Sequence, residues 1–241
     1  MPNHARSLAF GSLVTGLLIG TSFASHLESR SIYNAPQAAA AMRVDGIADE
    51  AAWDLAEWRD IKYKWLGPDY TPDDFAGRFK IVWTPERIYL LAEIVDDILI
   101  DSHRDPLVQY WDDDCLEIFI DEDFSGGEHH YNHNAFAYHF SLDNQAIDIG
   151  TDEKARSYSH HTQSTWRQHG DKIIWEVSID IYDDSYVDDG DNDPVALACE
   201  IDEFTANLAA CAAIHRALPC QTARHRCSPC PWRRSAPTPS Q

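Results

Sequence analysis

Hydrophobic and polar residues alternate with a period of two along much of the chain. Phe79, Ile81 and Trp83 fall on one side of such a segment, and a turn at 84–87 leads into the apolar run 88–95. Successive side chains of a β-strand point to opposite faces, so a period of two is typical of strands. The pattern predicts a β-hairpin in this part of the chain.

Three further segments alternate in the same way, with apolar residues expected to face inward and polar residues outward. Their apolar positions are Leu116, Ile118 and Ile120; Phe136, Tyr138 and Phe140; and Ile173, Trp175, Val177, Ile179 and Ile181. Many strands joined by turns rich in Asp, Gly and Asn predict an all-β fold. We expect a two-sheet antiparallel β-sandwich of the jelly-roll or immunoglobulin-like type. One short N-terminal helical turn is expected near 49–58, with Asp49 as its cap and Ala51, Ala52 and Leu55 packing.

The N-terminus has the order of a secretory signal. A positive residue, Arg6, precedes the apolar run 8–19, and small residues follow up to Ala24. This order predicts a signal peptide over 1–24 and a secreted or periplasmic protein; the alternative is an N-terminal core helix. Residues 25–41 are interpreted as a disordered lead. The β-sandwich domain is expected over 42–198, long enough for one domain with its own core.

The C-terminal segment 199–241 breaks the alternation and is rich in Ala, Cys, Arg and Pro. We interpret this atypical tail as disordered or as the product of a shifted reading frame. Cys227 and Cys230 have the spacing of half a zinc or redox site. No second half-site follows at a suitable spacing, which argues against a metal centre in the tail.

The chain is strongly acidic, with a formal net charge of −21, while 44% of its residues are hydrophobic. The hydrophobic content separates it from disordered acidic polymers. A body of this charge repels nucleic acid and anionic lipid surfaces, and it suits neutral ligands or cations. No nucleic-acid partner and no membrane insertion after signal cleavage are expected. The simpler interpretation of the charge is solubility.

Two loops gather carboxylates at short spacing. Asp96, Asp97 and Asp101 form one loop, and Asp188 and Asp191 belong to the other, which spans 183–193. Calcium takes six to eight oxygen ligands, so such loops are candidate calcium sites. The alternative is that these residues are solvated turn residues.

The segment around Trp111 combines an aromatic residue with acidic neighbours. Tyr110 and Trp111 precede Asp112–Asp114, and Glu117 follows in the next strand. Sugar rings present C–H faces that pack on indole, and their hydroxyls need carboxylate or amide partners. This segment is therefore a candidate sugar site, with Tyr110 and Asp114 at its rim. The alternative is a core Trp beside a solvated acidic loop.

Several short motifs occur together in a fixed order. They are Asp45-Gly46-x-x-Asp49-Glu50-x-x-Trp53, Phe79-x-Ile81-x-Trp83, Ile88-Tyr89-Leu90, Val95-x-Asp97 and Trp111-x-x-Asp114-x-x-Glu117-Ile118-Phe119-Ile120-Asp121. With these motifs the chain, from about residue 42 to 197, resembles the family 9 carbohydrate-binding module. That module is found attached to xylanases and in free-standing sugar-binding proteins.

The resemblance implies a β-sandwich with structural calcium and two Trp residues that clamp a terminal sugar. Trp111 matches the first clamp residue, and Glu117 matches a carboxylate that bonds sugar hydroxyls. Ala137 stands where the family carries an Arg. The second clamp Trp is expected in the last quarter of the family's domain, where this chain has its atypical tail, and Trp232 there has no matching context.

These observations predict an exported, non-catalytic module that binds a xylan- or cellulose-like glycan in support of carbohydrate catabolism, alongside other polysaccharide-degrading proteins. Three alternatives stay open: a haem- or metal-binding sandwich, an accessory domain of a glycoside hydrolase, and a structural sandwich that binds no sugar. The first rests on the histidines 129, 130, 133, 139, 160 and 161. No nucleophile motif, phosphate loop or zinc-protease signature occurs in the sequence. We therefore expect no intrinsic catalysis.

Overall fold

The computed structural model describes residues 33–62, 69–122, 131–133 and 135–197, which all belong to one unit of the chain. The predicted signal peptide (1–24), the first eight residues of the predicted lead (25–32) and the atypical tail (199–241), with Cys227 and Cys230, lie outside the described residues.

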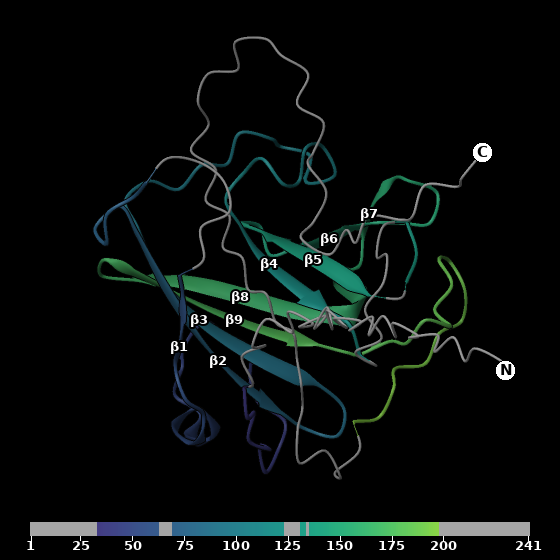
Figure 1. Cartoon of the computed structure of the whole chain (residues 1–241), viewed down its shortest axis with the longest axis horizontal. Helices are drawn as coiled ribbons and strands as arrows, with labels where there is room; N and C mark the ends of the chain where they lie inside the picture. The colour runs from purple at the N-terminus through teal and green to yellow at the C-terminus, as the bar shows by residue number, and fades with distance from the viewer. Residues whose placement is uncertain (1–32, 63–68, 123–130, 134, 198–241) are drawn as a thin grey trace, which may run out of the picture. The chain divides into compact units, whose positions relative to one another are not determined.

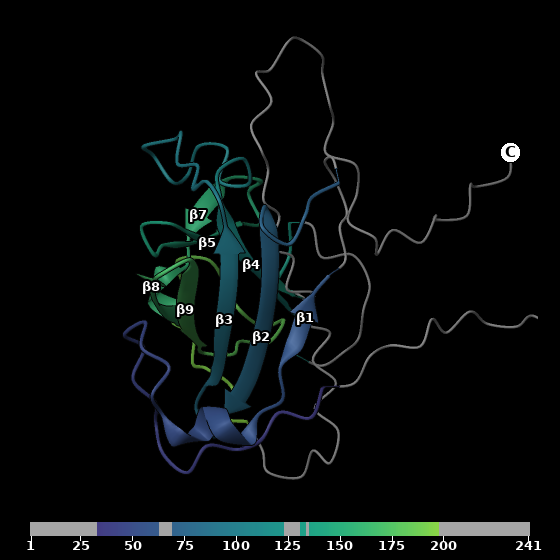
Figure 2. The same cartoon turned by 90° about the vertical axis from the view of Figure 1, so that its left-hand side faces the viewer.

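The larger sheet is antiparallel and has the strand order β1-β2-β3-β9-β8. Its strands are β1 (Arg59–Ile61), β2 (Phe75–Trp83), β3 (Ile88–Asp96), β8 (Thr162–His169) and β9 (Lys172–Ile179). The predicted hairpin is confirmed: β2 and β3 pair from Phe75–Asp96 to Trp83–Ile88. Thr84 closes its turn, because its N–H donates to the Arg87 carbonyl. Figure 2 shows β1, β2 and β3 side by side.

The smaller sheet is also antiparallel, with the order β4-β5-β6-β7. Its strands are β4 (Cys115–Ile120), β5 (Phe136–Ser141), β6 (Ala146–Ile149) and β7 (Ala155–Ser157). The two sheets form the layers of a sandwich (Figure 1).

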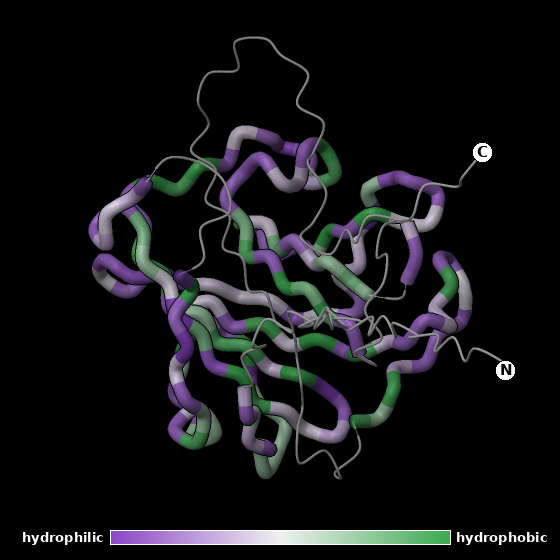
Figure 3. Tube along the Cα trace, viewed as in Figure 1, coloured by the Kyte–Doolittle hydropathy of each residue, from purple (hydrophilic) through white to green (hydrophobic). Residues whose placement is uncertain are grey.

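One hydrophobic core lies between the two sheets. It includes positions that alternation assigned to one face, among them Ile81, Ile118, Phe140 and Val177, and Leu90 of the apolar run 88–95 joins them. Figure 3 shows green hydrophobic and purple polar segments alternating along the strands. The predicted all-β, two-sheet antiparallel sandwich is therefore confirmed.

The predicted helical turn exists, but it is a short 3-10 helix, η1 (Ala51–Leu55), and its expected cap is wrong. Its N-cap is Glu50, which makes no side-chain cap bond, while Asp49 pairs with Arg43 at 3.4 Å. Leu55 is 64% exposed and does not pack. The other helix of the described residues is η2 (Ser159–His161). Among these residues, no helix has the length and apolar character needed to cross a membrane.

A buried carboxylate, and not a cap, fixes the segment before η1. Glu176 of β9 is 1% exposed. Its Oε2 accepts the backbone N–H groups of Asp45 and Gly46 at 3.0 and 2.9 Å, and its Oε1 accepts the indole N–H of Trp53 at 3.1 Å. Gly46 has φ +75°, and a Cβ there would lie 2.7 Å from Arg167 Cγ. The Asp-Gly…Trp motif thus supplies the three N–H donors that the buried carboxylate of Glu176 accepts.

Residues 33–38, part of the predicted disordered lead, pack on the sandwich. Tyr33 is buried in the core. Its hydroxyl donates to the Glu57 carbonyl at 2.6 Å and accepts the Ile81 N–H at 3.0 Å. Ala38 N–H donates to the Trp83 carbonyl at 2.7 Å. The ordered domain therefore begins before residue 42. The hydrogen bonds of this segment to the backbone of β2 hold it in place, and the alternation of apolar and polar residues does not predict them.

Candidate functional site

The outer face of the smaller sheet carries the polar half of the candidate site. In β4, Leu116 and Ile118 point into the core, so Glu117 between them points outward. In β5, His139 also points outward, because Tyr138 and Phe140 on either side of it face the core. The register of the two strands places Glu117 directly opposite His139. Cross-strand neighbours in this position are close enough to interact.

Glu117 and His139 form a largely buried pair. Glu117 Oε1 lies 3.4 Å from His139 Nε2, and His139 Nδ1 lies 2.8 Å from the Ala137 carbonyl oxygen, to which it donates. Burial disfavours the charged imidazolium, yet the hydrogen bond and the charge of Glu117 outweigh burial and raise the pKa of His139. The thiol of Cys115 lies 3.9 Å from the same carboxylate oxygen, and burial raises its pKa well above the usual value.

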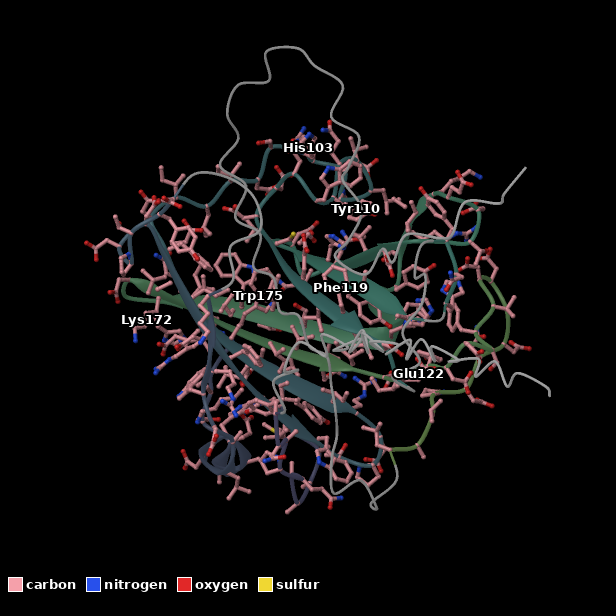
Figure 4. All side chains as sticks on the ribbon, in the orientation of Figure 1. His103, Tyr110, Phe119, Glu122, Lys172 and Trp175 are labelled. Atoms are coloured by element: carbon pink, nitrogen blue, oxygen red, sulfur yellow. The ribbon has the colours of Figure 1, made fainter. Side chains whose placement is uncertain are left out.

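An aromatic chain connects this pair to solvent. The Tyr110 ring stands edge-on to the His139 ring, with centroids 4.7 Å apart. The Trp111 ring stands edge-on to Tyr110 at 4.8 Å, and Trp111 is 40% exposed. We call Trp111, Tyr110, His139 and Glu117 the platform. Figure 4 shows Tyr110 near His103 in the loop before β4, with Phe119 further along that strand.

Two aspartates fix the loop that carries the platform. Asp113 accepts the backbone N–H groups of Ser102 and His103 at 2.7 and 2.9 Å, and its Oδ2 lies 3.1 Å from His103 Nδ1. Asp114 Oδ2 accepts the Ile100 N–H at 2.7 Å, while the Asp114 N–H donates to the Ile100 carbonyl at 3.0 Å. Burial raises the pKa of Asp113, but these hydrogen bonds and the attraction of His103 together lower it by more. The pKa therefore lies below its ordinary value.

Asp114 has an unusual environment for a carboxylate. It is 4% exposed, and its Oδ1 has no hydrogen-bond partner among the residues that the structure describes. Burial, with smaller contributions from the charges of Asp96 and Asp113, raises its pKa to about 6. Asp114 therefore lies beneath the loop and not on the exposed rim that the sequence suggested.

Asp114 makes folding stability depend on pH. Its pKa rises from 3.8 to about 6 on folding, so the folded state binds the proton more tightly and the free energy of unfolding falls as pH rises between these values. The shift corresponds to about 3 kcal/mol. We expect Asp114→Asn to remove the part of this fall that Asp114 causes and to be the more stable protein at pH 7, measured by urea unfolding at a series of pH values.

A second buried aspartate titrates in the same window and stays in the variant. Burial raises the pKa of Asp148 to about 6 as well, so a fall of the same sign persists in Asp114→Asn. The matched control is Asp60→Asn, at an exposed position of β1. Its stability curve should run parallel to that of the wild type. A curve for Asp114→Asn that also runs parallel to the wild type would contradict the assignment.

The four predicted calcium ligands belong to two loops that lie far apart. Asp96 ends β3, and the loop with Asp188 and Asp191 follows β9. Because β3 and β9 are antiparallel, with Ile88 opposite Ile179 and Ile94 opposite Ile173, the two loops lie at opposite ends of the strands, about 20 Å apart (Figure 1). One ion cannot bind both loops.

Asp188 is occupied by protein donors. Its Oδ1 accepts the Tyr158 hydroxyl at 2.7 Å and lies 3.2 Å from His133 Nε2. Its Oδ2 accepts the N–H and hydroxyl of Thr151 at 3.1 and 3.2 Å. The hydrogen bonds and the attraction of His133 together exceed the effect of burial and lower the pKa of Asp188. These donors show that Asp188 anchors its loop to Tyr158 and Thr151.

The histidines of the haem alternative are also engaged where they are described. His161 is fully buried, with Nδ1 2.8 Å from the Tyr138 hydroxyl and Nε2 3.1 Å from the Tyr186 hydroxyl. Burial, chiefly, lowers its pKa to about 3. His129 and His130 lie outside the described residues. In the described part of the chain, no three His, Cys, Asp or Glu side chains are arranged to hold a metal ion. Calcium binding at the acidic loops stays a prediction.

The structure brings three predicted sugar-site residues into one chain of contacts: Trp111, Tyr110 and Glu117. The fourth, Asp114, lies at the base of the same loop. Sequence reasoning missed His139 as a member of the site, although the register of β4 and β5 is the signal that identifies it. Ala137 lies opposite Phe119, so His139, and not residue 137, carries the basic group near Glu117. The second clamp Trp was expected where this chain has its atypical tail (199–241), which lies outside the described residues.

An antiparallel β-sandwich with an exposed indole connected to a buried acid–base pair has the form of a ligand-binding module. The chain belongs to the family described as carbohydrate family 9 binding domain-like, whose model matches residues 44–210. This family consists of binding domains and not of catalysts, which supports the prediction that the chain is not an enzyme. The predicted family is therefore confirmed.

Similar solved structures include two of a family 9 carbohydrate-binding module from Caldicellulosiruptor kristjanssonii. The complex with cellotriose is 19% identical, with a TM-score of 0.44, covering 61% of this chain and 66% of that one. The complex with glucose is 18% identical, with a TM-score of 0.41 and coverages of 60% and 66%. The match thus spans just under two thirds of the length of each of these two solved chains.

A third similar structure is a putative carbohydrate-binding protein from Bacteroides uniformis. It is 14% identical, with a TM-score of 0.41, covering 60% of this chain and 69% of that protein. No curated protein matches the chain.

Proposed function

We propose that this domain binds a carbohydrate by packing a sugar ring on Trp111. The observation that carries the proposal is the platform: an exposed indole linked through Tyr110 to the His139–Glu117 pair. An indole face attracts the C–H face of a sugar. The Glu117 carboxylate offers acceptor oxygens for the sugar hydroxyls, and His139 holds that carboxylate in place. Membership of the family supports the same function.

The proposed ligand is a xylan- or cellulose-like poly- or oligosaccharide outside the cytoplasm. The signal-like sequence at 1–24 supports export. The net charge of −21 disfavours anionic polymers and is compatible with neutral glycans. In this proposal the domain supports carbohydrate catabolism by holding a substrate near polysaccharide-degrading proteins, while it performs no chemistry itself. Calcium, where bound, stabilises the fold and does not contact the sugar.

Affinity electrophoresis through gels containing soluble xylan or hydroxyethyl cellulose tests the proposal, with a glycan array for wider coverage. We expect the mature chain to be retarded by at least one of these polymers, and retardation to persist at high salt because stacking is not ionic. The measurements are repeated with calcium and with a chelator, and a calcium-dependent melting temperature would support the structural ion. A folded protein that binds no glycan on the array would overturn the proposed function.

A further inference from the structure

A small pocket opens beside the platform, between the loop that precedes β4 and the turn that follows β5. Its volume is about 60 Å³, and its lining includes Asp101, His103, Tyr110, Asp114 and Asp143. This volume admits a small polar group, the size of one or two waters, but no sugar ring. The pocket is therefore suited to a substituent of a larger ligand.

Asp114 lines the pocket, and one of its carboxylate oxygens lacks a hydrogen-bond partner among the described residues. This side chain is more than nine-tenths buried, and no described residue donates to its Oδ1. Buried carboxylate oxygens nearly always have a donor in folded proteins. The free oxygen therefore indicates a hydrogen-bond donor that comes from outside the chain.

The charge around the pocket favours a donor that is positive. Four carboxylates line it, those of Asp101, Asp113, Asp114 and Asp143, against one guanidinium, that of Arg104. The pKa of Asp114 lies at about 6, because burial raises it and the nearby Asp96 and Asp113 raise it further. The positive charge of the surrounding residues therefore does not balance the charge of this carboxylate. A cationic group of a ligand in the pocket would balance it.

An ammonium group fits these partners better than a metal ion. Both oxygens of Asp113 already accept bonds from Ser102 and His103, and Asp143 accepts bonds from Ser141 and Gln145. Calcium needs six to eight oxygen ligands, and the described residues offer no cluster of three metal-binding side chains. An ammonium needs only one carboxylate and two further acceptors for its three N–H donors.

Tyr110 links the pocket to the sugar site. Its ring forms part of the pocket wall, and Trp111 contacts the same ring. We propose that the pocket takes the ammonium group of an amino sugar while the glycan packs on Trp111. The inference rests on the proposed function and names its ligand class: glycans with free amino groups. The net charge of −21 would attract such a cationic polymer.

Calorimetric titration with matched oligosaccharides tests the inference. The probes are β-1,4-linked glucosamine, its N-acetylated form and cello-oligosaccharide of the same length, at neutral pH. We expect the glucosamine oligomer to bind at least about tenfold more tightly than the other two, and this preference to weaken as salt rises. In Asp114→Asn this preference should disappear, so that the three oligomers bind with about equal affinity. Asp101→Asn, an exposed change at the pocket mouth, should reduce it by about two- to threefold.

Asp60→Asn on β1 is the matched control, since it removes one negative charge far from the pocket and should keep the full preference. Equal affinities of the wild type for the amino and neutral oligomers would overturn the inference and leave the proposed function intact. The same holds if Asp114→Asn and Asp101→Asn both keep the full preference. Failure to bind any of the three oligomers would count against both.

Discussion

Trp111→Ala is expected to abolish retention of the domain on xylan or cellulose gels. The substitution removes the exposed face on which the sugar packs. Covering an indole face contributes roughly 25 cal/mol per Å² of apolar surface buried, and stacking adds about 0.5–1.5 kcal/mol. Together the loss amounts to about 2–3 kcal/mol, which weakens binding about 30- to 150-fold. Affinity electrophoresis and calorimetry with the same glycan measure it directly.

The effect should be specific to the ligand and not to the fold. Trp111 is 40% exposed, so Trp111→Ala should leave the melting temperature nearly unchanged, and Trp111→Phe should recover part of the affinity. Trp58→Ala is the matched control, because Trp58 packs on Arg78 of the larger sheet, 4.2 Å from its guanidinium, away from the platform. Unchanged retention of Trp111→Ala would place the sugar elsewhere on the molecule.

Glu176→Ala is expected to have the largest effect on stability. It leaves three donors without their acceptor: the N–H groups of Asp45 and Gly46 and the indole N–H of Trp53. Each unsatisfied buried donor costs about 1–3 kcal/mol. The removed carboxylate was itself buried, and burial raises its pKa despite these bonds. Relief of that burial offsets part of the loss, so we expect a net cost of about 3–5 kcal/mol, a large part of a typical domain's stability.

Urea unfolding at neutral pH measures this loss, and two further variants separate its parts. Glu176→Gln has the same shape and keeps one acceptor oxygen, so it should cost less than Glu176→Ala. Trp53→Phe removes only the indole donor. A double-mutant cycle of Glu176→Ala with Trp53→Phe should show coupling of about 1 kcal/mol or more. If Glu176→Ala unfolds at the same urea concentration as the wild type, Glu176 does not anchor the 45–53 segment.

The sequence predicted the sandwich well because a period of two leaves little freedom. A one-residue shift would turn Leu116 and Ile118 outward and Glu117 into the core, so one register is strongly favoured. The beginning of the domain was harder to predict. Neither the capping role assigned to Asp49 nor the disorder assigned to 33–41 takes account of partners distant in sequence. Glu176 lies 130 residues from Gly46, and Tyr33 lies 48 residues from Ile81.

The candidate site was predictable in its residue types but not in its connections. Trp111 and Glu117 stood out because an aromatic residue followed by acidic residues suits the recognition of a sugar. His139 did not, since its role depends on which residue of β4 lies opposite it. The burial of Asp114 was equally hidden. From the sequence, acidic residues in a loop are expected to be solvated. Only the folded loop shows that the Asp114 carboxylate is buried and accepts the Ile100 N–H.

Hydrogen bonds hold the loop before β4 in one conformation before a ligand binds. Asp113 and Asp114 hold three backbone N–H groups of that loop, and Tyr110 rests on His139. Trp111 therefore starts from a rigid base before any sugar arrives, and binding loses little conformational entropy at the loop. A receptor with this preorganisation can hold a small sugar through few contacts. Differences in affinity among glycans should then appear mainly in how slowly each one leaves.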